Sequence, residues 1–166
     1  MSFLKKIYSG ELQDPTRVIG YSEDEVAQIE RLYDINIKGD FRDFMLEMGR
    51  CSGGLFGDEI VFYRDRSNFP VRRNLLAQVF LFEEISNLRL QKLHKAKPFN
   101  IARISETQYF YILTSHEYDD IVCHYDENYE TVKPTGKSFL EFMKEQADYY
   151  GSRQKDYICQ GELIKF

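Results

Sequence analysis

The sequence lacks a long hydrophobic run. Its longest strongly apolar stretch, residues 75–82, is interrupted by Gln78, whereas a membrane-spanning helix needs about 20 apolar residues. Near the N-terminus, Lys5 and Lys6 follow Phe3 and Leu4, and the apolar stretch of a signal peptide does not come after them. We therefore expect a cytoplasmic protein without a transmembrane helix.

Cysteine is scarce. Cys51, Cys123 and Cys159 are far apart, form no C-x-x-C pair and are odd in number, so they cannot all be paired within one chain. This usage is typical of proteins in a reducing compartment. We expect free thiols and no disulfide framework.

An excess of positive charge is also missing. The chain has 22 Lys and Arg residues against 27 Asp and Glu, which gives a net charge of −5. Binding to nucleic acid or to anionic lipid requires a basic face. We therefore expect no direct nucleic-acid partner and no membrane partner.

Phosphate-binding and nucleophile motifs are incomplete. Gly136-Lys137-Ser138 matches the end of a P-loop, but position 131 is Thr131 where a P-loop needs glycine. We interpret this tripeptide as a turn followed by a helix N-cap. Cys51 precedes two glycines without the G-x-S-x-G elbow of hydrolases. No catalytic residue and no cofactor are expected.

Three potential metal ligands, His116, Cys123 and His124, lie close together in the sequence. Imidazole and thiolate are ligands that zinc accepts. Adjacent residues of a strand, however, point to opposite faces, so at most one of Cys123 and His124 can join His116. We expect no metal site.

What the sequence does contain is enough apolar material for one domain. Its 166 residues are 43% hydrophobic and include 13 Phe and 12 Tyr. A chain of this length buries roughly 70% of its unfolded surface without a metal or disulfide. We expect a single domain over residues 1–166.

Local patterns predict most elements. Capping boxes at Ser22 to Glu25 and at Ser138 to Glu141 begin helices that end near Asp34 and Gly151. Asp40 is the expected N-cap of a helix that ends at Gly49. The other expected elements are a glycine loop at 51–57, a strand at 59–63, a helical region at 68–93, and strands at 100–104, 108–114 and 120–125 in an antiparallel meander. Residues 1–20 show no clear period, and the tail at 157–166 is either a further strand or a surface segment.

Residues 117–130 form an acidic segment. It contains six carboxylates and no Lys or Arg, so the rest of the chain carries a net charge of +1. Interleaved tyrosines would act as anchors and the carboxylates would attract a basic partner; the alternative is a solvated acidic hairpin. The candidate partner-binding residues are Glu117, Tyr118, Asp119, Asp120, Tyr125, Asp126, Glu127, Tyr129 and Glu130.

The order and spacing of several motifs resemble the SUKH superfamily, which includes fungal cell-wall assembly regulators and bacterial immunity proteins. The resemblance covers about residues 22–147, although Ile37-Lys38 stands where members usually have Leu-Pro, and Ser52 where they have Asn. The residues that carry it are Ile29, Glu30, Ile37, Phe41, Phe44, Gly53, Gly54, Ser138, Phe139 and Phe142.

The resemblance implies an α+β fold with a central, largely antiparallel β-sheet flanked by helices, no catalytic residues and action through protein binding. The leading hypothesis is an immunity protein that binds and neutralises a cognate toxin domain, such as a nuclease. Alternatives are a regulatory scaffold of cell-wall synthesis or signalling, and an enzyme that depends on Cys51 or the histidines.

Overall fold

The computed structural model describes residues 2–12, 14–56, 82–84, 86–87, 93, 95–103, 105, 107–115 and 120–151. The helices there are α1 (Phe3–Ile7), η1 (Pro15–Arg17), α2 (Glu23–Tyr33), α3 (Gly39–Met48) and α6 (Phe139–Gly151). The strands are β1 (Val18–Ile19), β2 (Cys51–Ser52), β3 (Pro98–Arg103), β4 (Gln108–Leu113), β5 (Ile121–Asp126) and β6 (Thr131–Ser138). The predicted α+β class is confirmed.

Strands β3 to β6 form an antiparallel sheet in sequence order, and β1 and β2 form a separate antiparallel pair. This confirms the predicted meander and adds β6, which the sequence analysis did not assign. One face of the sheet packs against the helices, where the ring centroids of Phe110 of β4 and Phe142 of α6 lie 5.2 Å apart. The opposite face carries a second apolar cluster around Tyr111, Cys123 and Tyr125.

Local sequence explains α2. Glu25 N donates to Ser22 Oγ at 3.2 Å, and Ser22 N donates to the Glu25 carboxylate at 2.8 Å, which completes the predicted capping box. The helix ends at Asp34, which adopts a left-handed conformation with φ 51°. The buried side chains Val26 and Ile29 form the apolar stripe that faces the core.

The start of α3 differs from the prediction. Lys38, not Asp40, is the N-cap residue, and its side chain makes no capping hydrogen bond. Asp40 lies in the first turn of α3, where its carboxylate accepts from Lys6 Nζ of α1 at 2.8 Å. A negative charge in a first turn still complements the helix dipole. The sequence analysis placed Asp40 at the start of the helix, but it did not predict the ion pair between Asp40 and Lys6.

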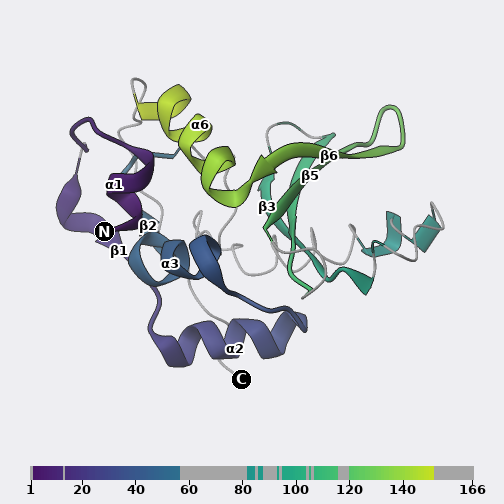
Figure 1. Cartoon of the computed structure of the whole chain (residues 1–166), viewed down its shortest axis with the longest axis horizontal. Helices are drawn as coiled ribbons and strands as arrows, with labels where there is room; N and C mark the ends of the chain where they lie inside the picture. Colours follow the sequence, from purple (N-terminus) through teal and green to yellow (C-terminus); the bar gives the residue numbers. More distant parts are fainter. Residues whose placement is uncertain are drawn as a thin grey trace.

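At the junction of β6 and α6, the predicted turn at Gly136 and Lys137 is wrong. Gly136 and Lys137 belong to β6, not to a turn, and Gly136 has φ 75° beside a register shift between β5 and β6. The predicted capping box at Ser138 is confirmed, because Ser138 N donates to the Glu141 carboxylate at 2.9 Å and Glu141 N donates to Ser138 Oγ at 3.2 Å. The strand therefore leads directly into the helix (Figure 1).

The N-terminal helix α1 completes the core, although its sequence shows no clear period. Phe3 is buried and packs edge-on against Phe44 of α3, with the ring centroids 5.5 Å apart. The ring centroid of Phe139 of α6 lies 6.0 Å from that of Phe3. Tyr8 Oη donates to the carbonyl of Gly151 at 3.0 Å. Residues at the two ends of the described chain thus pack together on one side of the molecule (Figure 1).

Some predicted elements lie outside the described residues. These are the strand at 59–63, most of the helical region at 68–93 and the tail at 157–166. Within the helical region, residues 82–84, 86–87 and 93 are described, and they are helical.

Candidate functional site

The structure divides the acidic segment into two places. Asp120 lies directly before β5, whereas Asp126 and the turn residues 127–130 lie at the other end of that strand. Six strand residues span about 20 Å. Glu117, Tyr118 and Asp119 lie outside the described residues. Asp120 therefore does not join the carboxylates of the turn.

Asp120 has a structural task. Its carboxylate accepts from the backbone N–H of Phe139, the first residue of α6, at 3.0 Å. The residue adopts φ 67°, a left-handed conformation that Asp tolerates better than most residues. A substitution at Asp120 would consequently disturb the start of α6 as well as any surface.

Tyr125 lies in the interior. Its side chain is 1% exposed, and its hydroxyl donates to the Glu84 carboxylate at 2.9 Å. Burial, and then this hydrogen bond, raise the pKa of the phenol. Because alternate residues of a strand face opposite sides, Tyr125 joins Tyr111 under the sheet, and it cannot touch a partner directly.

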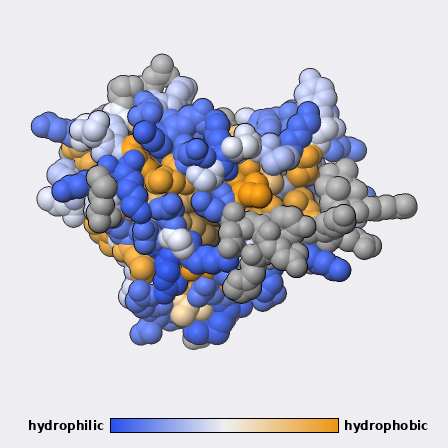
Figure 2. All heavy atoms as spheres, viewed as in Figure 1, coloured by the Kyte–Doolittle hydropathy of each residue, from blue (hydrophilic) through white to orange (hydrophobic). Residues whose placement is uncertain are grey.

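The turn between β5 and β6 projects from the sheet, at the upper right of Figure 1. We call residues 126–130 the acidic tip. It contains the carboxylates of Asp126, Glu127 and Glu130, together with Tyr129, whose side chain is 76% exposed. In Figure 2 this projecting end is largely hydrophilic.

Hydrogen bonds hold the acidic tip in shape. Asn128 N donates to Asp126 Oδ1 at 3.0 Å, and the Asn128 side chain donates to Thr107 Oγ1 at 2.8 Å. The backbone N–H of Glu127 donates to the carbonyl of Thr107 at 3.0 Å. The tip is thereby attached to the turn before β4. Thr107 lacks any local sequence signal for this role, because its partners are about twenty residues away.

Hydrogen bonds stabilise the charged form of Asp126 in the acidic tip. A hydrogen bond from the Gln108 side chain, followed by hydrogen bonds from Asn128, holds the pKa of Asp126 below its ordinary value. His124 contacts the same glutamine and stacks on Phe110 at 4.7 Å. Burial lowers the pKa of His124, so this imidazole is mostly neutral at pH 7. The tip therefore carries net negative charge around neutral pH.

The residues considered for chemistry are separated. Cys123 is buried on the face opposite His124, as expected from strand alternation, and burial raises the pKa of its thiol to about 11. Cys51 is 2% exposed in β2, and His116 lies outside the described residues. In the part of the chain that the structure describes, no cluster of three or more His, Cys, Asp or Glu could hold a metal ion.

The family motif residues build the core and its connections. Glu30 of α2 accepts from the backbone N–H of Ile37 at 2.7 Å and so fixes the link between α2 and α3. Gly53 and Gly54 adopt φ 65° and 89°, which explains the glycine loop because other residues resist positive φ. Six apolar motif residues are buried in the main core: Ile29, Ile37, Phe41, Phe44, Phe139 and Phe142.

A hollow of about 210 Å³ lies between the start of α3 and the end of β4. Its lining includes the apolar residues Phe41, Ile112 and Leu113 and the carboxylates of Asp40 and Asp120. Both carboxylates already have partners within the chain, since Asp40 pairs with Lys6 and Asp120 accepts a hydrogen bond at the start of α6.

The fold and the surface together define an α+β domain with an acidic hairpin whose turn is held by hydrogen bonds. The chain matches the family model described as SMI1-KNR4 cell-wall (SUKH_6) over residues 23–143, and it belongs to this family of the SUKH superfamily. Membership indicates a role in protein–protein interaction.

No curated protein and no solved structure matches the chain. None of the helices in the described ranges is long and apolar enough to cross a membrane.

Proposed function

We propose that this chain is a cytoplasmic, non-enzymatic immunity protein that binds and neutralises a cognate toxin domain. The observation that carries the proposal is the acidic tip, where an exposed tyrosine stands among carboxylates on a turn held by Thr107. Tyrosine is one of the residue types that anchor binding hot spots, and carboxylates around it would attract a basic partner. Family membership supports action through a protein partner.

The proposed mechanism is occlusion of a basic groove. A toxin that acts on nucleic acid needs a positively charged active-site surface, and carboxylates can occupy the positions of phosphates there. Opposite charges on the two proteins also accelerate their encounter. The net charge of −5 for the whole chain acts in the same direction.

The first experiment expresses the C-terminal domain of the large open reading frame beside this gene, with and without this protein, and counts surviving cells. Rescue together with a purified one-to-one complex is the expected result. A harmless neighbour, or killing without rescue, would contradict this toxin assignment and favour the alternative of a regulatory scaffold.

The second experiment maps the surface with charge reversals. Glu127→Lys and Glu130→Lys change the tip without touching the cap at Asp120, so they are better probes than a reversal at Asp120 itself. They should slow association by about tenfold and weaken its salt dependence. Asp24→Lys, on α2, is the matched control. Unchanged association rates for the tip variants would place the interface elsewhere.

A further inference from the structure

The side of α6 that faces solvent is also acidic and carries a tyrosine. We call this the outer face of α6. It carries three carboxylates against one lysine, and all its members are exposed: Glu141, Lys144, Glu145, Asp148 and Tyr149. Their spacing of three and four residues places them on one side of the helix.

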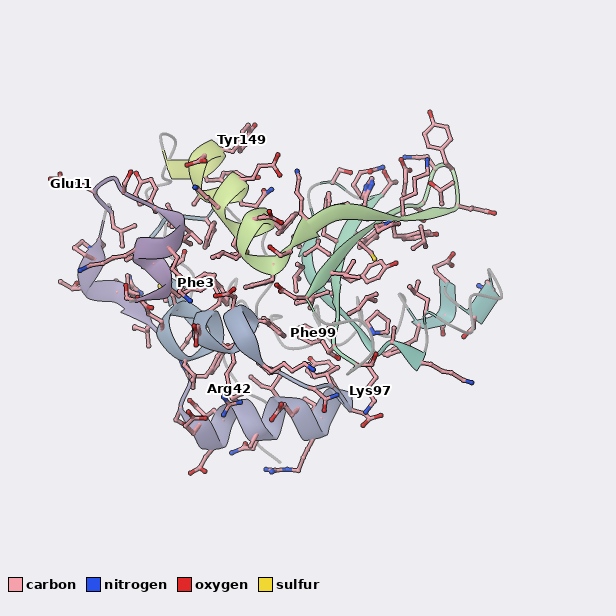
Figure 3. The ribbon with its side chains drawn as sticks, viewed as in Figure 1. Phe3, Glu11, Arg42, Lys97, Phe99 and Tyr149 are labelled. Carbon is pink, nitrogen blue, oxygen red and sulfur yellow. The ribbon has the colours of Figure 1, made fainter. Side chains whose placement is uncertain are left out.

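Tyr149 is the unusual member of this face. Its side chain is 56% exposed, whereas its neighbour Tyr150 is 7% exposed and meets it edge-on with ring centroids 4.8 Å apart. Figure 3 shows Tyr149 on the outer side of the helix. The buried ring of Tyr150 thus supports an exposed aromatic side chain on a regular helix.

Large apolar side chains are exposed in one part of the described chain. They are Ile121, Tyr129 and Tyr149, all from the segment between the start of β5 and the end of α6. Two of these three side chains are tyrosines, a residue type that is enriched among the anchors of binding hot spots. Ile121 pairs with Ser138 and so lies beside the junction of β6 and α6.

The acidic tip and the outer face of α6 are structurally continuous. β6 runs from Thr131 at the tip to Ser138, and α6 begins at the next residue. Lys137 of β6 forms an ion pair with Glu145 on the outer face of α6. The path from the tip to Tyr149 follows eight strand residues and eleven helical residues, or about 40 Å.

We infer that the partner-binding surface extends from the acidic tip along β6 onto the outer face of α6, and that Tyr149 is a second anchor for the same basic protein partner. The inference rests on the proposed function and deepens it. Charge identifies the occupant: the acidic tip and the outer face of α6 hold six carboxylates, and even with Lys133 and Lys137 of β6 and Lys144 of α6 the whole surface keeps a net negative charge. A protein with an elongated basic surface complements this arrangement.

The fixed position of α6 favours a binding role for its outer face over a role as a solvated surface alone. α6 begins in a capping box and at the Asp120 carboxylate, and its last residue accepts from Tyr8 Oη. Its inner side buries Phe139, Phe142 and Met143. Because the helix is fixed at both ends, its backbone loses little conformational freedom on binding.

The test measures binding of the neighbouring toxin domain to the full-length chain by surface plasmon resonance at several salt concentrations. Tyr149→Ala should raise Kd by at least about tenfold, mainly through faster dissociation. Asp148→Lys should slow association several-fold. Asp24→Lys, on α2 at the opposite side of the molecule (Figure 1), makes the same charge change and should leave Kd within about twofold.

The outcomes are distinguishable. If Tyr129→Ala weakens binding while Tyr149→Ala and Asp148→Lys leave it within about twofold, the surface ends at the hairpin and this inference is wrong, although the proposed function stands. If the wild-type chain does not bind the toxin domain, the proposed function fails as well. The melting temperatures of the Tyr149→Ala and Asp148→Lys variants must match that of the wild type, since both side chains are exposed.

Discussion

Tyr125 and Tyr129 show how position decides the task of a residue. Both belong to the acidic segment, yet one is 1% exposed beneath the sheet and the other is 76% exposed at the acidic tip. A strand directs alternate side chains to opposite faces, and a turn directs them to solvent. The aromatic ring of Tyr125 therefore stabilises the core, whereas that of Tyr129 is available to a partner.

Gly20 is fixed by packing. A methyl group at this position would overlap the backbone carbonyl of Leu46 in α3. Gly20→Ala should lower the free energy of unfolding by about 1–3 kcal/mol, because a backbone group cannot move aside as a side chain can. Urea unfolding followed by circular dichroism measures this change.

Gly39→Ala provides the comparison for Gly20→Ala. Gly39 has φ 55° but open space around the position of a Cβ atom, so only backbone strain of about 1 kcal/mol is expected. Equal losses for the two variants would show that the contact with Leu46 is not the cause.

At the scale of elements, capping determines where α2 and α6 begin. In each helix a serine at the N-cap and a glutamate three residues later exchange hydrogen bonds with the backbone. These contacts are local, so the sequence predicts both starts. α3 has no capping side chain at Lys38, and its start is fixed instead by contacts with α1 and by the link from Glu30 to Ile37.

The capping box of α6 predicts a dependence on pH. Hydrogen bonds from Ser138, first from its backbone N–H, hold the pKa of Glu141 below its ordinary value of 4.5. A carboxyl group whose pKa is lowered on folding stabilises the folded state above that ordinary value, and this contribution disappears as the pH falls through the folded-state pKa. Glu141→Gln should therefore differ most from the wild type at neutral pH, and the difference should shrink below pH 4.5.

Urea unfolding at a series of pH values measures this difference. Asp148→Asn, which removes a carboxylate from the same helix outside the cap, is the matched control. Ser138→Ala removes the other half of the box and should cost about 1 kcal/mol at neutral pH. A difference between Glu141→Gln and wild type that stays constant with pH would show that the carboxylate does not cap the helix.

At the scale of the whole molecule, the domain extends beyond the region that matches the family. The match covers residues 23–143, but α1 lies before it and the second half of α6 after it. Phe3 and Ile7 of α1, with Ala147 and Tyr150 of α6, belong to the main core. The two ends of the described chain complete one hydrophobic core.

We therefore expect that a fragment of residues 23–143 does not fold stably. It loses the aromatic contacts of Phe3 with Phe44 and Phe139, and a buried Phe→Ala change alone costs about 3–5 kcal/mol. Circular dichroism and thermal unfolding of the fragment and the full chain provide the measurement. Within the full chain, Phe3→Ala should lower the melting temperature, whereas Lys5→Ala on the exposed side of α1 should not. A cooperative transition of the fragment at the wild-type temperature would contradict this expectation.

The predicted and the observed structures agree where the physics is local. Serine and glutamate at capping spacing, with apolar residues at helical spacing, predicted α2 and α6. Three successive segments joined by polar turns, at 100–104, 108–114 and 120–125, predicted β3, β4 and β5. β6 was missed because Pro134, Gly136 and two lysines give it a weak strand pattern, and α1 because five residues contain too few turns to show a period.

The sequence by itself determined the starts of the capped helices, the meander and the excess of negative charge, since each depends on neighbours in the chain or on composition, and its resemblance to the SUKH superfamily implied the fold class. Only the tertiary structure decided that Asp120 caps α6, that Tyr125 is buried, and that Thr107 fixes the acidic tip. These contacts join residues about twenty or more positions apart, so no local pattern encodes them. Their geometry arises only when the strands pair and α6 packs against the sheet.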